Sequence, residues 1–418
     1  TPLPPCGPEG QFEYLGLKFA PWTGFDHQKV ICDFINTIPS IKRLKLKPTQ
    51  KLELLRKFII PHFLYKLSVN PPPQEGLRNV DKHIRSFIKD TFHLPACTSS
   101  SFIYAPNKDG GLGVPRVENL IKYTYLRSAL KCRDSDDPVL RKLWTENGIE
   151  ERVNTLARKA NISEFPLTIE IIERAKRRAK RTEWRKWLSC SSQGQGASSF
   201  KNDKVGNSWM KRLDLLRNSR FIDALRLRTN TFGCKAALAR AGLTTDMLCR
   251  RCHAANETLG HILGQCPAGK GRRIRRHDEI AKLFIKGFCE KFPDSQYTIE
   301  PTLETESKRL RPDIIISTGD AAYIVDVTVR YEQGETLKRA YSEKYNKYKC
   351  LKELVQNIFG VPSCEVLPLV VGSRGAMPRS TLNTFEELTK NGKKDALTAS
   401  MIALRSSIEI TNAFLDEC

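Results

Sequence analysis

Four side chains of the types that bind metals lie within one short segment of the chain. Cys249 and Cys252 are two residues apart, His261 follows after eight more, and Cys266 follows after a further four. Two cysteines at this spacing can turn both sulfurs toward one point, and the following loop can return a histidine and a third cysteine. Thiolate and imidazole ligands in this number favour a tetrahedral Zn²⁺, which folds small segments that lack a core. The spacing predicts a structural zinc site, against the alternative of three unrelated cysteines and a chance histidine.

Two aspartates further along the chain are suited to a different metal ion. Asp313 precedes the apolar run 314–316, and Asp326 lies inside the apolar stretch 323–329, with twelve residues between the two acids. A carboxylate within an apolar strand is costly unless it binds a cation or lies at the end of a sheet. A hairpin that turns at Gly319 would bring both acids to one end of a sheet. There they could share Mg²⁺, which activates water and neutralises charge at a phosphate.

Cationic side chains follow on the next predicted helix. Lys344, Lys347 and Tyr348 are spaced at i, i+3 and i+4, so they share one helix face. A lysine there would supply the positive charge that a phosphate under attack requires. The alternative is that Asp313 only caps a turn, Asp326 pairs with a lysine, and Lys344 is solvated.

Composition limits the classes of protein that fit. The 418 residues carry 69 Lys and Arg against 46 Asp and Glu, a formal net charge of +23, which favours a polyanionic partner and nucleic acid first. No apolar stretch approaches the ~20 residues of a membrane helix. The thirteen cysteines are odd in number and mostly scattered, so we expect a reducing compartment rather than a disulfide framework. The chain opens without a secretory signal and without an initiator Met, which suggests a fragment.

The first part of the chain is predicted to be mostly helical. A short strand-like run covers residues 12–19, and residues 189–199, rich in Ser, Gly and Gln, are predicted to be a flexible connection. Helices are predicted from about residue 28, over 49–59, from 81 to about 95 and through most of 117–241. A strong turn signal lies at 107–115.

The most basic segment is the predicted helix over residues 171–190. It carries eight Lys or Arg against two Glu, and Trp184 and Trp187 interrupt the run. These tryptophans could stack on bases, although such aromatics more often form the core face of a helix. A second basic group surrounds the cysteine cluster. The residues predicted to contact nucleic acid in the two groups are Arg174, Arg177, Arg178, Arg181, Arg250, Arg251, Arg272, Arg273, Arg275 and Arg276.

The last part of the chain has a mixed α and β pattern. An amphipathic helix over 274–292 is followed by alternating residues 297–303 and by the hairpin described above. A helix over 336–359, a strand over 366–371 buried on both faces, and a helical end complete the domain. Of its other acids, Glu300 is a candidate auxiliary metal ligand, and Glu332 is expected to be exposed.

Together these residues resemble the carboxy-terminal part of the polyproteins of site-specific non-LTR retrotransposons that insert into ribosomal RNA genes. In that family a reverse transcriptase is followed by a thumb, a linker, a Cys-Cys-His-Cys knuckle and a restriction-like endonuclease of the PD-(D/E)xK type. The knuckle spacing is the most specific match, and the Gly-Gly-Leu-Gly segment at 110–113 is a second. The resemblance implies Asp313 and Asp326 as metal ligands. It also implies a catalytic lysine displaced to the next helix, because Thr328 stands where most enzymes of the fold keep theirs; Lys344 is the first choice and Lys347 the reserve.

The resemblance also implies a multidomain fold. Mostly α-helical thumb and linker regions would lead into a small zinc knuckle and an α/β restriction-like endonuclease domain. The expected boundaries are 1–26 for the end of the reverse transcriptase palm, 27–116 for thumb-like helices, 117–245 for the basic linker, 246–273 for the knuckle and 274–418 for the endonuclease. Polymerisation needs paired aspartates on a hairpin, but the only such pair, Asp136-Asp137, has no flanking strand. The polymerase palm is therefore expected upstream of Thr1.

The implied function is magnesium-dependent nicking of target double-stranded DNA. The nick would prime reverse transcription of the element RNA by the upstream reverse transcriptase domains of the same polyprotein. The expected cofactors are structural Zn²⁺ and catalytic Mg²⁺, and the expected location is the nucleus, with no membrane partner. The alternative is a nucleic-acid-binding zinc module whose nuclease fold is inactive.

Overall fold

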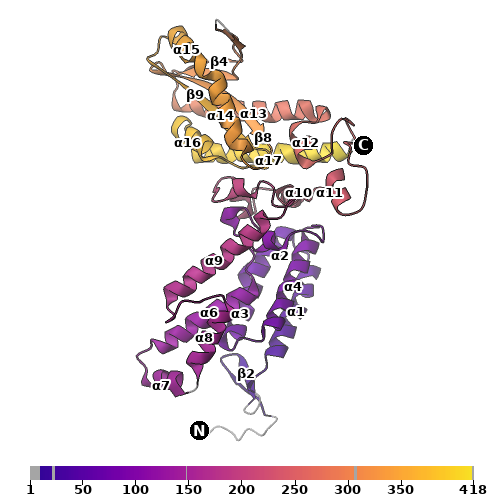
Figure 1. Cartoon of the computed structure of the whole chain (residues 1–418), viewed down its shortest axis with the longest axis vertical. Helices are drawn as coiled ribbons and strands as arrows, with labels where there is room; N and C mark the ends of the chain where they lie inside the picture. Colours follow the sequence, from indigo (N-terminus) through magenta and orange to yellow (C-terminus); the bar gives the residue numbers. More distant parts are fainter. Residues whose placement is uncertain (1–9, 21–23, 147, 306–307, 417–418) are drawn as a thin grey trace. The chain divides into compact units, whose positions relative to one another are not determined.

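The structure, a computed structural model, describes residues 10–20, 24–146, 148–305 and 308–416 (Figure 1). The opening residues 1–9, to which the expectation about a secretory signal belongs, lie outside the described residues, as do residues 21–23 of the palm-like segment. The chain divides into two compact units. Thr1–Pro106 and Leu112–Lys186 form the helical unit, and Asn107–Gly111 and Trp187–Cys418 form the sheet unit.

The helical unit begins with a small antiparallel sheet, and helices make up most of the rest. The strands are β1 (Phe12–Tyr14), β2 (Leu17–Ala20) and β3 (Gly24–Phe25). The first helices are α1 (His27–Arg43), α2 (Pro48–Leu54), a π-helical turn (Leu55–Ile59), α3 (Ile60–Val69), α4 (Gln74–Thr91) and α5 (Ser100–Tyr104). They are followed by α6 (Val117–Arg133), α7 (Pro138–Glu146), α8 (Ile149–Lys159) and α9 (Ile169–Leu188).

A buried aspartate joins two helices of this unit. Asp81 of α4 is 2% exposed, and its carboxylate accepts the backbone N–H groups of Val117 (2.9 Å) and Glu118 (3.0 Å) at the start of α6. These are amides that a helix start leaves without an internal partner, and a negative charge there also suits the helix dipole. Burial raises the pKa of Asp81, although the two N–H bonds partly oppose this effect. The contact fixes where α6 begins against α4.

The sheet unit is built on a four-stranded sheet with the order β4-β7-β8-β9. The strands are β4 (Gln296–Ile299), β7 (Ile314–Ser317), β8 (Ala321–Arg330) and β9 (Ser363–Gly372). Strands β4, β7 and β8 are antiparallel neighbours, and β9 runs parallel to β8. The short strands β5 (Leu303–Glu304) and β6 (Arg309–Leu310) pair separately. The predicted hairpin and the predicted buried strand are confirmed.

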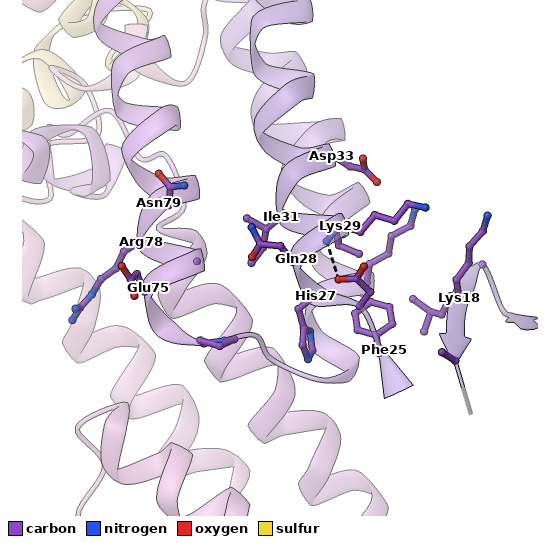
Figure 2. A pocket seen from close by; sticks show the side chains of 18 of the residues that line it. Lys18, Phe25, His27, Gln28, Lys29, Ile31, Asp33, Glu75, Arg78 and Asn79 are labelled. Carbon is purple, nitrogen blue, oxygen red and sulfur yellow. Dashed lines mark hydrogen bonds between the residues drawn. The ribbon is translucent and has the colours of Figure 1, made fainter. Parts of the chain in front are cut away.

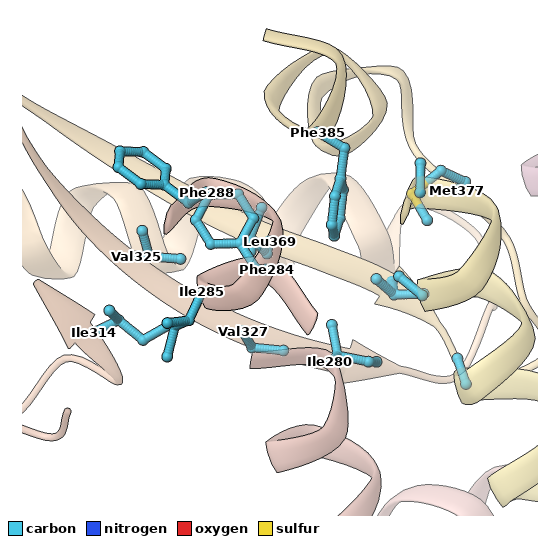
Figure 3. Close-up of a cluster of buried hydrophobic side chains, with 14 of the residues drawn as sticks. Ile280, Phe284, Ile285, Phe288, Ile314, Val325, Val327, Leu369, Met377 and Phe385 are labelled. Carbon is cyan, nitrogen blue, oxygen red and sulfur yellow. The ribbon is translucent and has the colours of Figure 1, made fainter. Parts of the chain in front are cut away.

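Helices cover both faces of this sheet. On one face α14 (Thr336–Tyr348) and α15 (Lys352–Phe359) pack on β8 and β9 around Ile315, Ile324 and Val355. On the other face lie α13 (Lys270–Lys291), α16 (Arg379–Leu388) and α17 (Lys393–Asp416). Figure 3 shows the core on that side, where Phe284 and Phe288 of α13 meet strand side chains such as Val325. Successive strand residues point to opposite faces, which explains why 314–316 are all isoleucine.

Residues 187–245 belong to the sheet unit and are tightly folded. They include α10 (Asn218–Arg228) and α11 (Lys235–Arg240), and α10 packs on α17. The prediction that residues 189–199 form a flexible connection is wrong. Gly196 has a φ of +75°, and a Cβ atom there would lie only 2.1 Å from the carbonyl oxygen of Glu332, so the chain needs glycine for a buried close approach. Trp187 is fully buried and donates to the carbonyl oxygen of Gln193 (2.9 Å), which makes it a core residue.

The short elements that remain in the sheet unit lie around the cysteine cluster. They are α12 (Leu259–Gly264) and a 3₁₀ turn (Pro267–Gly269), which leads directly into α13. The helix expected over residues 336–359 is divided by a 3₁₀ turn (Lys349–Leu351). Among the described residues, no helix is both long enough and apolar enough to cross a membrane.

Candidate functional site

The four predicted zinc ligands converge. One ligand atom from each of Cys249, Cys252, His261 and Cys266 lies within 4.8 Å of all the others. The Sγ atoms of Cys249 and Cys266 are 3.8 Å apart, and the Sγ atom of Cys252 is 3.3 Å from Nε2 of His261. Sulfurs placed about 2.3 Å from a common centre at tetrahedral angles would be about 3.8 Å apart. The donor set and its spacing therefore fit Zn²⁺.

Local structure orients the histidine of this cluster. Thr258 caps α12 by accepting the backbone N–H of His261 (3.1 Å), which directs the ring toward the cysteines. Burial lowers the pKa of His261, so the ring is neutral and Nε2 can offer a lone pair to a metal. Its buried Nδ1 has no hydrogen-bond partner within the described part of the chain. His253, which lies between the ligands in sequence, is not part of this cluster.

Of the two predicted catalytic aspartates, Asp313 lies directly before β7 and Asp326 lies on the neighbouring strand β8. Ile314 of β7 pairs with Val325 of β8, so the register carried on by one residue sets Asp313 opposite Asp326. Directly opposed residues inside antiparallel strands point to the same face. Asp313 precedes β7, however, and the two acids contact different helices: Asp313 contacts His277 of α13, and Asp326 contacts Lys344 of α14. Asp326 is only 1% exposed, and its Oδ2 lies 2.8 Å from Nζ of Lys344. Thr328 donates a hydrogen bond to the same oxygen (3.3 Å).

Asp313 is held by three contacts that the sequence did not reveal. Its Oδ2 accepts the backbone N–H of Val327 (2.7 Å) and lies 2.9 Å from Nε2 of His277. Its carbonyl oxygen accepts the backbone N–H of Glu300 (2.8 Å). The hydrogen bond to Asp313 raises the pKa of His277 to about 9, with a smaller contribution from Asp278. The other carboxylate oxygen, Oδ1, has no hydrogen-bond partner among the residues described.

His277 is the residue of the candidate site that sequence reasoning missed. It falls within the amphipathic helix predicted over 274–292, and the structure places it on α13. Its contact with Asp313 spans 36 positions in sequence, and no spacing rule links the two. A histidine within a basic helix was the only available signal.

The residues on α14 divide between the two acids and a buried tyrosine. Lys344 pairs with Asp326, whereas Nζ of Lys347 lies 2.8 Å from the hydroxyl of Tyr348. That hydroxyl donates to the carbonyl oxygen of Arg311 (3.0 Å). Burial, and then the negative charges of Asp326 and Asp313, raise the pKa of Tyr348. Tyr348 therefore lies close to both carboxylates and stays protonated.

Glu300 lies beside the acids but its side chain is engaged elsewhere. It forms an ion pair with Arg311, and its φ of +49° is unusual for a residue other than glycine. Its backbone N–H, rather than its carboxylate, contacts Asp313.

Some of the arginines near the cysteines that were predicted to contact nucleic acid are bonded to other groups of the protein. Arg250 pairs with the fully buried Glu257 (2.7 Å), and Arg251 donates to the carbonyl oxygen of Phe414 (3.0 Å). Arg276 is 3% exposed and donates to Ser407 (2.8 Å) and to the carbonyl oxygen of Leu263. These three side chains hold the cysteine cluster to α17 and to its own loop. Residues with less burial are Arg272 and Arg273, and Arg275 is exposed.

On α9 of the helical unit, two of the arginines predicted to contact nucleic acid form ion pairs within the protein, and two others are exposed. Arg174 and Arg178 lie 3.2 Å and 3.8 Å from the carboxylate of Glu164. Arg177 and Arg181 are exposed on the same helix.

A hollow in the helical unit was not predicted from the sequence. It has a volume of about 1390 Å³ and lies among β2, α1 and α4 (Figure 2). Asp26 caps α1 beside it by accepting the backbone N–H of Lys29 (3.1 Å). The hollow is lined by three carboxylates and by six cationic side chains. The cationic side chains are Lys18, Lys29, Lys66, Arg78, Lys82 and Arg85.

Comparison with known proteins agrees with the resemblance suggested by the motifs. The chain is 25% identical over 381 residues to the "Retrovirus-related Pol polyprotein from type-1 retrotransposable element R2" of Popillia japonica, which covers 89% of this chain and 75% of that protein. It is 28% identical over 343 residues to the corresponding polyprotein of the type-2 element R2DM of Drosophila melanogaster, which covers 81% of this chain. The chain resembles R2 retrotransposon polyproteins. It spans only 31% of the Drosophila polyprotein and 32% of the one from Nasonia vitripennis. No protein-family model matches the chain.

Similarity to R2 polyproteins extends over both units, because the aligned 381 residues exceed the length of either one. The predicted link to a transposable element is confirmed, and the Cys-Cys-His-Cys cluster fits the expected zinc knuckle.

Proposed function

We propose that the sheet unit is a metal-dependent DNA endonuclease of the restriction-like type. It nicks one strand of target DNA, and the new 3′-hydroxyl primes reverse transcription of element RNA by polymerase domains of the parent polyprotein. The observation that carries this proposal is the register of β7 and β8, which, continued by one residue, sets Asp313 beside Asp326, with Lys344 2.8 Å from Asp326.

The acids are prepared for a cation by their surroundings. Asp326 is buried, and an ionised carboxylate there is costly without a cationic partner. Asp313 is fixed by Val327 and His277 through one oxygen, so its other oxygen can face a ligand. Mg²⁺ held by Asp313 and Asp326 would supply an activated water and neutralise charge on the phosphate.

Lys344 supplies positive charge at the same place. It comes from α14, which packs on β8 and β9, so the helix holds the ammonium group above the strand that carries Asp326. With a cation bound by the acids, Lys344 can turn to a phosphate oxygen, since its side chain is 24% exposed. Lys347 is the second choice of catalytic lysine. Its contact with the hydroxyl of Tyr348 indicates that it stabilises the helix rather than the phosphate.

The remaining parts of the chain serve binding in this proposal. The zinc knuckle is structural, and the exposed Arg177, Arg181 and Arg275 contact phosphate groups. Arg250, Arg251 and Arg276 are left out of the interface because their guanidinium groups hold the fold together. Nuclear location follows from the chromosomal target.

A plasmid-nicking assay tests the endonuclease. The full chain is incubated with Mg²⁺ and a supercoiled plasmid that carries a ribosomal RNA gene. Asp313→Asn and Asp326→Asn are expected to abolish nicking while DNA binding remains. Asp320→Asn is the matched control, because Asp320 lies exposed at the turn of the same hairpin.

The alternative is a zinc-containing module that binds nucleic acid but does not cut it. The ion pair between Lys344 and Asp326 favours it, because a buried acid with a lysine partner is already satisfied. Absence of magnesium-dependent nicking in the wild type would establish this alternative, whereas nicking that survives Asp326→Asn would refute the assignment of the acids.

A further inference from the structure

A hollow of about 460 Å³ lies beside the candidate nuclease site within the sheet unit. One wall is a single face of α13, formed by Lys270, Arg273, Ile274 and His277 at i, i+3, i+4 and i+7. Gly264 of the knuckle forms another part. The hollow therefore connects the cysteine cluster with the strands that carry the acids.

The hollow carries excess positive charge. The two acids that line it are already engaged: Glu300 pairs with Arg311, and Asp278 contacts His277 (3.0 Å). Arg273 donates to the carbonyl oxygen of Cys266 (2.5 Å), which orients the guanidinium without cancelling its charge. Lys270 is exposed and forms no ion pair with any described residue. Lys270 and Arg273 thus line the hollow together with Arg276 and His277, against two acids that already have cationic partners, and this balance favours an anion.

The hollow is adjacent to a proposed catalytic acid. His277 lines it, and the same ring contacts Oδ2 of Asp313 (2.9 Å). A group bound in the hollow is therefore separated from Asp313 by one side chain. Ile274, 49% exposed, and Val329 add apolar surface, which suits the sugar of a nucleotide and which a free phosphate ion does not need.

We infer that this hollow is a subsite for a backbone phosphate of the DNA strand, next to the phosphate that is cut, held by Lys270 and Arg273. The inference rests on the proposed endonuclease function and adds a specific anchor to it. Its role is to fix the strand so that the scissile phosphate lies at Asp313 and Asp326.

A binding experiment that requires no cleavage tests the subsite. The full chain is titrated with a short random-sequence DNA duplex in Ca²⁺, at a series of salt concentrations. Lys270→Ala should weaken binding by roughly 5- to 10-fold and lower the slope of log K against log salt by about one. Lys282→Ala is the matched control, because Lys282 is an exposed lysine of the same helix outside the hollow, and it should change affinity by less than about 2-fold. Equal effects of the two variants would overturn the inference.

A second arm identifies which phosphate is bound. Once the nick is mapped, duplexes with one neutral methylphosphonate at each position around it are compared. For the wild type one flanking position should weaken binding most, and for Lys270→Ala that position should cost nothing further. Additive losses at every position would refute the subsite. Competition by inorganic phosphate that equals competition by DNA would assign the hollow to a free ion instead.

The two arms also separate this inference from the proposed function. A wild type that never nicks, yet loses affinity and salt slope through Lys270→Ala, would overturn the endonuclease and keep the hollow as a phosphate site. If the wild type nicks DNA but Lys270→Ala binds as tightly as Lys282→Ala, the endonuclease is kept and the phosphate site is overturned.

Discussion

Glu332 and Arg374 form an ion pair in which neither side chain is exposed to solvent. Oε2 of Glu332 lies 3.0 Å from Nε of Arg374, and Oε1 accepts the backbone N–H of Arg374 (2.8 Å). The guanidinium also donates to the carbonyl oxygens of Gln195 and of Glu332 itself. The pair therefore ties the end of β9 to the segment 187–245 within the sheet unit. Removing its negative charge is a severe test of this packing.

We expect Glu332→Gln to destabilise the sheet unit by about 3–5 kcal/mol. Glutamine has nearly the same size, but its amide group places a donor where Arg374 also donates. The guanidinium is fully buried, so water cannot replace the lost charge. Glu335→Gln is the control, since Glu335 is 65% exposed and its ion pair with Lys338 is a surface pair worth less than about 1 kcal/mol.

Hydrogen exchange measured by mass spectrometry on peptides of β8 and β9 reports this change for the sheet unit alone, in the full chain. A loss of about 3–5 kcal/mol corresponds to roughly 10²- to 10⁴-fold faster exchange. The reasoning is refuted if Glu332→Gln exchanges within about tenfold of the wild type, or if Glu335→Gln has an effect of the same size.

Three further outcomes are expected. Lys344→Ala should slow plasmid nicking by roughly 10²- to 10³-fold, because it removes charge beside Asp326, whereas Lys347→Ala should cost less than about tenfold; equal losses would contradict the assignment. Cys252→Ser should lose the single zinc ion that an indicator dye detects on denaturation, and the exposed Cys350→Ser should keep it. Burial raises the pKa of Asp203 to about 6 from 3.8, so the folded state holds the proton more tightly and the stabilisation present at low pH is lost as pH rises through 6. Relative to Asp203→Asn, the wild type should lose about 3 kcal/mol of unfolding free energy between about pH 4 and pH 7 in denaturant titrations, and a flat difference would exclude this effect.

Features encoded by local spacing could be predicted from the sequence. The cysteine and histidine positions lie within 18 residues, so the loop that joins them fixes their convergence. The hairpin that opposes Asp313 and Asp326 is equally local, because apolar runs flank a glycine turn. Lys344 could be assigned to the same helix face as Lys347, but only the structure shows that the first contacts Asp326 and the second contacts Tyr348.

Features that depend on distant partners could not be predicted. Glu332 was expected to be exposed, and that expectation is wrong, because Arg374, 42 positions later, supplies a buried counter-charge. The glycines of residues 189–199 suggested flexibility, but Gly196 permits a close approach to Glu332. Contact between His277 and Asp313 belongs to the same class.

The pairing frame of β7 and β8 depends on only four residue pairs and a turn through Thr318, Gly319 and Asp320. Side chains alternate along a strand, so sliding β8 by one position would exchange its two faces. Asp326 would then enter the layer that holds Phe284 and Phe288, and a valine would stand before Lys344. One inserted residue in that turn could thus separate Asp326 from Asp313 and Lys344 while every strand and helix remains. The length of a surface loop far from the acids is in this sense a component of the chemistry.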